Sequence, residues 1–265
     1  MTKRFAVIGD PVSHSLSPLM HMGWIKDHNL DATYEALLLR SDDPVAAIRN
    51  LEGFAGVNVT VPHKEVAAKA ADRSEDAVAN TLRWEADGTI SAFNTDGGGF
   101  VDALDAAAPG WRDKAETAVI IGAGGAARGI AAALAGSMKI IIVNRTYPRA
   151  AELAAQFPKA GAALWPALRA VFSEADLIIN ATTLGMSGGD SPDWPVAWCR
   201  RGTLVVDIVY RPLETPLLKS AREQGLTAID GLGMLIHQGA RAFEIWFGIK
   251  PDAGKARQRL MATLA

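Results

Sequence analysis

Residues 117–127 read TAVIIGAGGAA, an apolar run that passes into glycines and then into alanines. The run predicts a buried strand, and the alanine-rich continuation to residue 135 predicts a helix. Gly122 permits the tight turn between them, Gly124 lets a pyrophosphate approach the backbone, and Ala127 is small enough for close helix packing. The stretch therefore predicts a dinucleotide site at a helix N-terminus, with these candidate contacts: Gly122, Gly124, Gly125 and Ala126. A glycine-rich turn without a ligand is the alternative.

The next predicted strand, residues 139–143, is followed by Asn144-Arg145-Thr146, with Arg149 one turn further on. Enzymes that use NAD usually place a carboxylate about 20 residues after the glycine turn, where it binds the ribose 2′-hydroxyl. Two guanidinium groups instead suit a 2′-phosphate, and each charged hydrogen bond contributes about 1.5–3 kcal/mol. The pair predicts a preference for NADP of roughly two to three orders of magnitude. The alternative is that both arginines are solvated surface charges.

Strand-like and helix-like segments alternate along the rest of the chain. Predicted strands cover residues 5–8, 34–39, 56–60, 82–84, 89–93, 117–121, 139–143, 176–180 and 204–207. Predicted helices cover residues 18–28, 44–51, 63–71, 100–107, 126–135, 149–157, 232–247 and 251–265. This alternation predicts the α/β class, with a doubly wound parallel sheet in the second half and a domain boundary near residues 100–115. Asp87-Gly88 predicts a hairpin turn.

The composition is that of a globular protein, and the length suits two domains. The 265 residues are 49% apolar and carry a formal net charge of −2. Such a charge does not suit a nucleic-acid binder, and no stretch is long and apolar enough to span a bilayer. The single cysteine, Cys199, excludes a disulfide framework and a thiolate metal site within one chain. We therefore expect a cytoplasmic protein with no bound metal and with neither a nucleic-acid nor a membrane partner.

Small polar residues gather in the first half of the chain, beginning with residues 9–18, GDPVSHSLSP. Ser15 and Ser17 are two residues apart, so their hydroxyls share one face of an extended segment. Two hydroxyls on one face suit a polyhydroxylated or carboxylate ligand. The alternative is that Ser17 caps a helix that begins at Pro18.

Residues 58–65, NVTVPHKE, form a second polar cluster at the end of a predicted strand. The strand delivers Thr60 to a helix N-terminus, and Lys64 lies in the first turn of that helix. The positive end of the helix dipole favours an uncharged amine, which suits a group that transfers protons. Asn80 and Asp96 supply further polar side chains, and the three glycines after Asp96 predict that it is held in a tight, sterically open position. Each of these features also has an interpretation as turn chemistry.

With these motifs in order along nearly its whole length, the chain resembles the shikimate/quinate dehydrogenase family. The motifs that carry the resemblance are residues 9–18, 58–65, 94–97 (NTDG), 122–126 (GAGGA), 144–146 (NRT), 180–182 (NAT), 212–218 (PLETPLL) and 230–235 (DGLGML). The resemblance implies a two-domain α/β enzyme with a cleft between a substrate domain, residues 1–100, and a Rossmann-type NADP-binding domain, residues 101–235. It also implies that the C-terminal helices, residues 236–265, return to the substrate domain.

The resemblance implies a role for each group of site residues. Lys64 and Asp96 would form the catalytic pair, with Lys64 as the acid/base at the reacting hydroxyl. The substrate carboxylate would be bound by Ser15, Ser17 and Tyr210, and the ring hydroxyls by Thr60, Asn80, Asp96 and Gln238. The nicotinamide side would be lined by Ala181, Thr182, Ile208, Gly231 and Met234. These roles imply NADP as the cofactor, reversible hydride transfer between NADPH and 3-dehydroshikimate, a small hydroxy-acid substrate, and a monomer or homodimer.

Three features differ from what we expect of the family. The segment from Lys64 to Asn80 is several residues shorter, residues 77–79 lack a glycine, and Met22 replaces an expected asparagine. Because these changes lie in the substrate half, a paralogue that acts on quinate or on an amino-shikimate is an alternative, although Ser17 favours shikimate. A non-catalytic NADP-binding regulator and a purely structural domain are alternatives from other classes of function.

Overall fold

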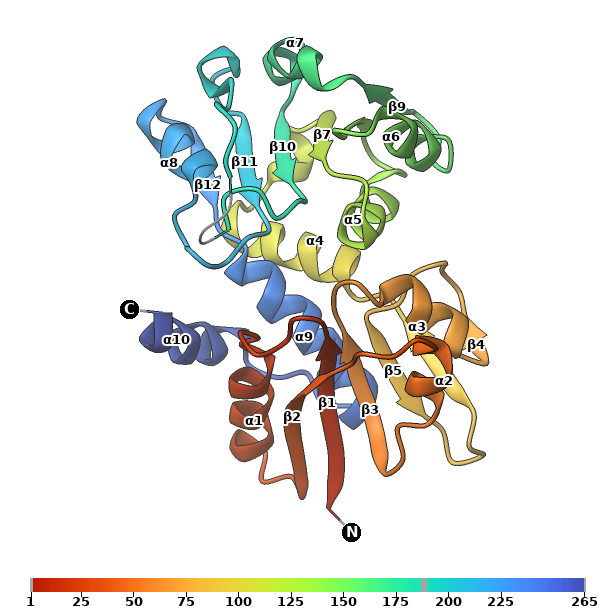
Figure 1. The fold of residues 1–265 in the computed structure, drawn as a ribbon. Helices are drawn as coiled ribbons and strands as arrows, with labels where there is room; N and C mark the ends of the chain where they lie inside the picture. Colours follow the sequence, from red (N-terminus) through yellow and green to blue (C-terminus); the bar gives the residue numbers. More distant parts are fainter. Residues whose placement is uncertain (1, 187–189, 265) are drawn as a thin grey trace. The chain divides into compact units, whose positions relative to one another are not determined.

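The structure is a computed structural model that describes residues 2–186 and 190–264. The chain divides into two compact units, unit 1 (Met1–Gly99 with Ile236–Ala265) and unit 2 (Phe100–Leu235) (Figure 1). Both boundaries fall inside helices, so α4 (Asp96–Ala107) and α9 (Leu232–Phe247) each contribute residues to both units. Within the described ranges, none of the helices is long and apolar enough to cross a membrane.

Unit 2 is built on a parallel sheet. Its strands are β7 (Thr117–Ile121), β8 (Lys139–Val143), β9 (Ala160–Ala163), β10 (Leu177–Asn180), β11 (Leu204–Asp207) and β12 (Thr227–Ile229). They lie in the order β12-β11-β10-β7-β8-β9, and the pairings are parallel. The chain starts in the middle, adds β8 and β9 on one side and then crosses to the other. This order confirms the predicted doubly wound sheet, and its direction reverses between β7 and β10, where such sheets bind ligands.

Both faces of this sheet are buried, which explains why its strands read as nearly continuous apolar runs. Ile120 lies in one apolar cluster with residues of α5 (Gly125–Leu134) and α6 (Tyr147–Ala154). The neighbouring Ile121 lies in a second cluster with residues of α7 (Leu168–Glu174) and α8 (Pro216–Glu223). Because successive residues of a strand point to opposite faces, α5 and α6 cover one face and α7 and α8 the other.

Unit 1 has a mixed sheet. Its strands are β1 (Lys3–Gly9), β2 (Ala32–Leu38), β3 (Phe54–Val59), β4 (Arg73–Ser74), β5 (Thr81–Trp84) and β6 (Ile90–Phe93), in the order β2-β1-β3-β5-β6-β4. β1 pairs in parallel with both β2 and β3, whereas β5 and β6 form the antiparallel hairpin that Asp87-Gly88 predicts. The carboxyl ends of parallel β1 and β3 meet at one edge, and so do the polar segments that follow them.

A buried aromatic cluster ties two helices of unit 1, α1 (Ser17–Asp27) and the C-terminal part of α9, to its sheet. The other helices of the unit include α2 (Pro44–Arg49), α3 (Lys64–Ala70) and α10 (Ala253–Leu264). His21 of α1 stacks on Tyr34 of β2 with ring centroids 4.3 Å apart, and it also contacts Phe243 and Trp246 of α9. Burial lowers the pKa of His21 to about 3, and neither ring nitrogen has a hydrogen-bond partner among the described residues. The imidazole is therefore neutral at ordinary pH.

The start of α4 differs from the sequence expectation. The helix begins at Asp96 rather than at residue 100, so the three glycines form its first turn. A Cβ at Gly98 would lie 2.6 Å from Cζ of Arg241, and one at Gly99 would lie 2.4 Å from the backbone nitrogen of Gln238. The turn is tight, as predicted, but the prediction that it is sterically open is wrong, because the glycines allow α9 to pack closely against it.

Several short elements are not predicted from the sequence. These elements are β4, β9, β12, α7 and α8. Each has eight residues or fewer, too few to show a clear helical or strand period. Ala265 of the predicted last helix lies outside the described residues.

Candidate active site

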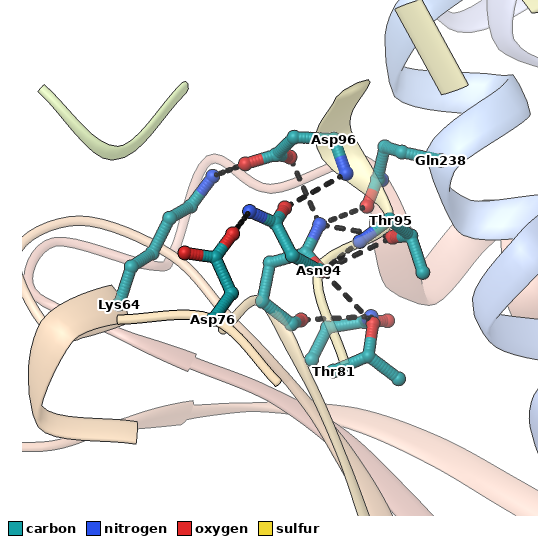
Figure 2. A network of polar contacts seen from close by, with 9 residues as sticks. Lys64, Asp76, Thr81, Asn94, Thr95, Asp96 and Gln238 are labelled. Carbon is teal, nitrogen blue, oxygen red and sulfur yellow. Dashed lines mark hydrogen bonds and ion pairs between the residues drawn. The ribbon is translucent and has the colours of Figure 1, made fainter. Parts of the chain in front are cut away.

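The candidate site in unit 1 centres on an ion pair between two helix N-termini. Lys64 is the first residue of α3 and Asp96 the first residue of α4, and Nζ of Lys64 lies 2.5 Å from Oδ2 of Asp96 (Figure 2). Only 16% of the Lys64 side chain and 5% of the Asp96 side chain are exposed. Low exposure makes the attraction stronger than that of a surface pair. The amine of Lys64, the predicted acid/base, is therefore held firmly against the carboxylate of Asp96.

Asn80 holds the other oxygen of Asp96. Its Nδ2 lies 2.9 Å from Oδ1 of Asp96 and 3.2 Å from Oε1 of Gln238. Its Oδ1 accepts the backbone N–H of Thr95 at 2.8 Å. The structure thus brings two predicted substrate residues, Asn80 and Gln238, into the network of the predicted catalytic pair. Thr95, which the sequence analysis does not select, links this network to the start of α4.

Thr60 lies at the edge of the sheet where β1 and β3 end. Its N–H donates to the carbonyl of Ile8 at 2.9 Å. A Cβ at Gly9 would lie 2.3 Å from Cγ2 of Thr60, so only glycine fits at that position. The segment that carries Ser15 and Ser17 therefore leaves β1 directly beside the predicted substrate residue Thr60.

Ser15 and Ser17 are fixed by local contacts. The hydroxyl of Ser15 accepts the N–H of Ser17 at 3.2 Å. α1 begins at Ser17 with Leu16 as its N-cap, and no side chain makes a cap hydrogen bond there. The alternative that Ser17 caps the helix is therefore wrong. Its buried hydroxyl lies beside the phenol of Tyr34 instead.

Asn58 and Tyr34 form a buried polar contact that the sequence analysis misses. The Tyr34 hydroxyl donates to Oδ1 of Asn58 at 2.7 Å, and Nδ2 of Asn58 donates to the Thr81 hydroxyl at 3.1 Å. Burial raises the pKa of Tyr34 well above its usual value, so the phenol remains a donor. An asparagine inside an otherwise apolar strand was the signal that could have identified this contact.

The candidate cofactor site in unit 2 lies where the strand order reverses. Gly122 follows β7, and Ala181 and Thr182 follow β10. Gly122 has a φ of +114°, and a Cβ there would lie 2.8 Å from the Ala181 carbonyl oxygen and 3.0 Å from Cγ2 of Thr182. Glycine is therefore required both for the backbone conformation and for the close approach. The structure brings these three predicted residues together.

The N-terminus of α5 fits the phosphates of a dinucleotide. Gly124 is the N-cap, with no cap hydrogen bond from a described side chain, and a Cβ at Gly124 would meet nothing within 4 Å. The N–H groups of Gly125 and Ala126, in the first turn, have no carbonyl within the helix to bind. Free donors, an open approach and the positive end of the helix dipole together suit a pyrophosphate.

The turn after β8 holds the two predicted arginines. Nδ2 of Asn144 donates to the carbonyl of Thr146 at 3.0 Å, which orders the turn. Arg145 and Arg149 are exposed and pair with no carboxylate of the described residues. Two unpaired guanidinium groups at this place fit an anionic group such as a 2′-phosphate.

A buried network joins the loops after β10 and β11. Nδ2 of Asn180 donates to Oδ1 of Asp207 at 3.0 Å, and Oδ1 of Asn180 accepts the N–H of Thr182 at 3.1 Å. Asp207 also accepts the N–H of Val209 at 3.0 Å and the hydroxyl of Thr215 at 2.7 Å. Burial raises the pKa of Asp207 above its usual value. From the sequence, Asp207 is predicted only as the end of a strand, although a carboxylate that ends an apolar run is a usable signal of a buried polar contact.

The remaining predicted residues of unit 2 lie on two adjacent segments. A Cβ at Gly231 would lie 2.2 Å from the carbonyl oxygen of Ile208, so these two segments of the backbone are in direct contact. Met234 is buried in the same apolar cluster as Ile120. Tyr210 is half-buried after β11, and burial raises its pKa above the usual value.

Comparison with known proteins identifies the family. A model of the shikimate dehydrogenase substrate binding domain matches residues 7–82, one of shikimate / quinate 5-dehydrogenase matches residues 107–186, and one of the shikimate 5′-dehydrogenase C-terminal domain matches residues 231–261. A protein named shikimate dehydrogenase (NADP(+)) from Brucella abortus (strain S19) is 44% identical over 273 residues, which cover 98% of this chain and 94% of the relative. This chain belongs to the shikimate/quinate dehydrogenase family.

Solved structures of the shikimate/quinate dehydrogenase family share the fold. The shikimate 5-dehydrogenase of Thermus thermophilus, in complex with NADP(H) and shikimate, matches with a TM-score of 0.87 and 36% identity over 99% of this chain and 100% of that one. The quinate dehydrogenase of Corynebacterium glutamicum, in complex with NAD, matches with a TM-score of 0.88 and 28% identity over 98% of this chain and 99% of that one.

Membership of the shikimate/quinate dehydrogenase family confirms the resemblance that the motifs indicate. Lys64 lies in the first matched segment, Gly122 in the second and Gln238 in the third. Asp96 and Tyr210 lie outside the matched segments. The roles of the individual residues remain predictions.

Proposed function

We propose that this chain is an NADP-dependent shikimate dehydrogenase, which reduces 3-dehydroshikimate to shikimate reversibly. The observation that carries the proposal is the Lys64–Asp96 ion pair in a chain of the shikimate/quinate dehydrogenase family. A paired amine with little exposure supports acid–base chemistry at a hydroxyl. It argues against both a non-catalytic regulator and a purely structural domain.

Lys64 moves the proton in this proposal. In reduction, Nζ donates a proton to the oxygen of the ring carbonyl, and in oxidation it accepts the proton of the ring hydroxyl. Oδ2 of Asp96, 2.5 Å from Nζ, orients the amine and balances its charge. A positioned acid–base group contributes about 10²–10⁴-fold in rate.

The remaining groups of the substrate site bind and orient the ring. We assign the ring hydroxyls to Thr60, Asn80, Asp96 and Gln238, and the carboxylate to Ser15, Ser17 and Tyr210. Asn80 and Gln238 already share a hydrogen bond at 3.2 Å, so part of their ordering cost is met before substrate binds. Ser17, in place of threonine, supports shikimate over quinate.

We assign the cofactor contacts from the features of unit 2 that fit a dinucleotide. Bound NADPH would supply the hydride that reduces the ring carbonyl. We assign its pyrophosphate to the turn from Gly122 to Ala126 and its 2′-phosphate to the group Asn144, Arg145, Thr146 and Arg149. We assign its nicotinamide to Ala181, Thr182, Ile208, Gly231 and Met234. The unpaired charges of the two arginines support NADP over NAD.

The test is a spectrophotometric assay of nicotinamide reduction that crosses two acids, shikimate and quinate, with two cofactors, NADP and NAD. We expect rapid turnover of shikimate with NADP and at least tenfold lower kcat/KM for the other three combinations. The matched control is the Lys64→Ala variant, which should bind NADPH normally but should turn over slowly.

Two outcomes would contradict the proposal. Preferred turnover of quinate would make the chain a quinate dehydrogenase of the same family. Normal NADPH binding with no turnover of either acid would favour a paralogue with another substrate or a non-catalytic regulator.

A further inference from the structure

The connection between α3 and β5 brings an additional carboxylate, Asp76, into the polar network of unit 1. α3 ends at Ala70, and the chain then forms β4, which pairs with β6. The backbone carbonyl of Asp76 accepts the hydroxyl of Ser74 at 2.8 Å, which fixes the turn after β4. This connection is the segment that we expect to be shorter than in other members of the family. The β4–β6 pairing and this hydrogen bond therefore fix the position of Asp76 in the connection.

Asp76 contacts the catalytic network through Asn94. Oδ2 of Asp76 accepts a hydrogen bond from Nδ2 of Asn94 at 2.9 Å (Figure 2). Oδ1 of the same amide accepts the backbone N–H of Asp96 at 3.2 Å. Exchanging the amide oxygen and nitrogen would place two acceptors together at Asp76 and two donors together at Asp96. The carboxylate of Asp76 therefore selects one orientation of Asn94.

That orientation matters for the catalytic pair because Asp96 is the first residue of α4. Its N–H is one of the donors that a helix leaves without an internal acceptor, and Asn94 supplies the acceptor. Holding this backbone N–H fixes the backbone position from which the Asp96 side chain extends. The two oxygens of that side chain then meet Nζ of Lys64 and Nδ2 of Asn80.

We propose that Asp76 is a positioning residue for the Lys64–Asp96 pair, and that it acts as a hydrogen-bond acceptor through the amide of Asn94. The inference rests on the proposed function for its kinetic consequence. Asp76 does not transfer a proton itself. It restricts the position of the Asp96 carboxylate, which holds the amine of Lys64. Small displacements of such groups lower the reaction rate considerably.

The first experiment compares Asp76→Ala with Asp76→Asn in the full-length protein. Asp76→Ala should lower kcat for shikimate about tenfold, with KM for shikimate and NADP changed by less than about twofold. Asp76→Asn should recover most of kcat, because its amide oxygen can still accept from Asn94. Glu75→Ala is the matched control, since it removes the same charge from the adjacent exposed residue and should keep the wild-type kcat.

A double-mutant cycle tests the route through Asn94. If Asp76 acts only through that amide, Asp76→Ala should cost nothing further in an Asn94→Ala background. Additive losses of kcat in the double variant would overturn the route. Loss of kcat in Asp76→Asn equal to that in Asp76→Ala would also overturn the proposal, because the charge and not the hydrogen bond would then be responsible.

Amide exchange gives a readout that does not depend on turnover. The backbone N–H of Asp96 should exchange about tenfold faster in Asp76→Ala than in the wild type, with no such change in Glu75→Ala. Unchanged exchange and unchanged kcat in Asp76→Ala would overturn this inference while the proposed function stands. Failure of the wild type to oxidise shikimate would instead overturn the proposed function, and the exchange rate would still decide whether Asp76 positions Asp96.

Discussion

Each unit buries an aspartate beside an asparagine, and the two networks differ in what faces the carboxylate. In unit 1, Asp96 accepts from Asn80 and lies 2.5 Å from the amine of Lys64. In unit 2, Asp207 accepts from Asn180, from the hydroxyl of Thr215 and from a backbone N–H, all of them neutral donors. The same pair of residue types is thus placed in two electrostatic environments.

This difference predicts a reaction at the first network and a purely structural role for the second. An amine beside the carboxylate can give and accept a proton, so the network of unit 1 can take part in a reaction. Neutral donors around Asp207 can only hold the loops after β10 and β11 in place. Removing the cation from the first network should therefore affect rate, whereas removing the acceptor from the second should affect stability.

The largest effect is expected for Lys64→Ala. Loss of the amine should lower kcat by about 10²–10⁴-fold with little change in KM, because the proton transfer is lost and ground-state binding is not. Steady-state kinetics with shikimate and NADP would measure it. Lys69→Ala, at an exposed position of the same helix, is the control. A near-normal kcat for Lys64→Ala would remove Lys64 from the chemistry.

The second effect concerns the two exposed arginines of unit 2, Arg145 and Arg149. The double variant Arg145→Ala/Arg149→Ala should weaken NADP binding by roughly two to three orders of magnitude and leave NAD binding unchanged, because only NADP carries the 2′-phosphate. Fluorescence titration with both reduced cofactors would measure it, with Arg201→Ala as an exposed control in the same unit. Equal losses for both cofactors would contradict the assignment.

The third effect is on stability. Asp207→Leu leaves the side chain of Thr215 and the N–H of Val209 without their acceptor in a buried place, which should lower the free energy of unfolding by about 3 kcal/mol. Asp207→Asn should cost less, since one acceptor oxygen remains. Denaturant unfolding would measure both. A loss below about 1 kcal/mol for Asp207→Leu would show that Asp207 does not hold the loops.

The smallest effect is a pH dependence that should differ between the two units. The folded protein keeps His21 of unit 1 neutral down to a pKa of about 3, whereas the unfolded imidazole titrates near 6.5. The unfolded state therefore binds more protons between these values, and stability falls as the pH drops. Asp207 has the opposite sign, because a raised pKa adds stability in acid that is lost as the pH rises through that pKa.

Denaturant unfolding at about pH 7 and about pH 5 would test the pH dependence. His21 alone should cost about 2 kcal/mol over this interval, and unit 1 should lose its structure before unit 2. The control is His21→Phe, which keeps a ring against Tyr34 and should remove most of the slope. An unchanged slope in that variant would assign the acid sensitivity to other groups.

The long elements and the two polar centres could be predicted from the sequence because their signals are local. The apolar run before Gly122 and the glycines after it specify a strand, a turn and a helix within a dozen residues, and the structure has all three. The ends of β1 and β3 were likewise marked by adjacent polar motifs. Short elements such as β4 and α7 were missed, since they are held by tertiary contacts rather than by a pattern of their own.

The sequence by itself determined the α/β class, the doubly wound order of unit 2 and the candidate residues Lys64 and Asp96. Only the tertiary structure decided that α4 starts at Asp96, that Asp76 orients Asn94 and that Asp207 joins two loops. The physical reason is the distance along the chain over which each kind of interaction acts. Periodicity and turn chemistry act over a few neighbouring residues, whereas a buried side-chain hydrogen bond joins groups that are far apart in the chain and meet only when the elements pack.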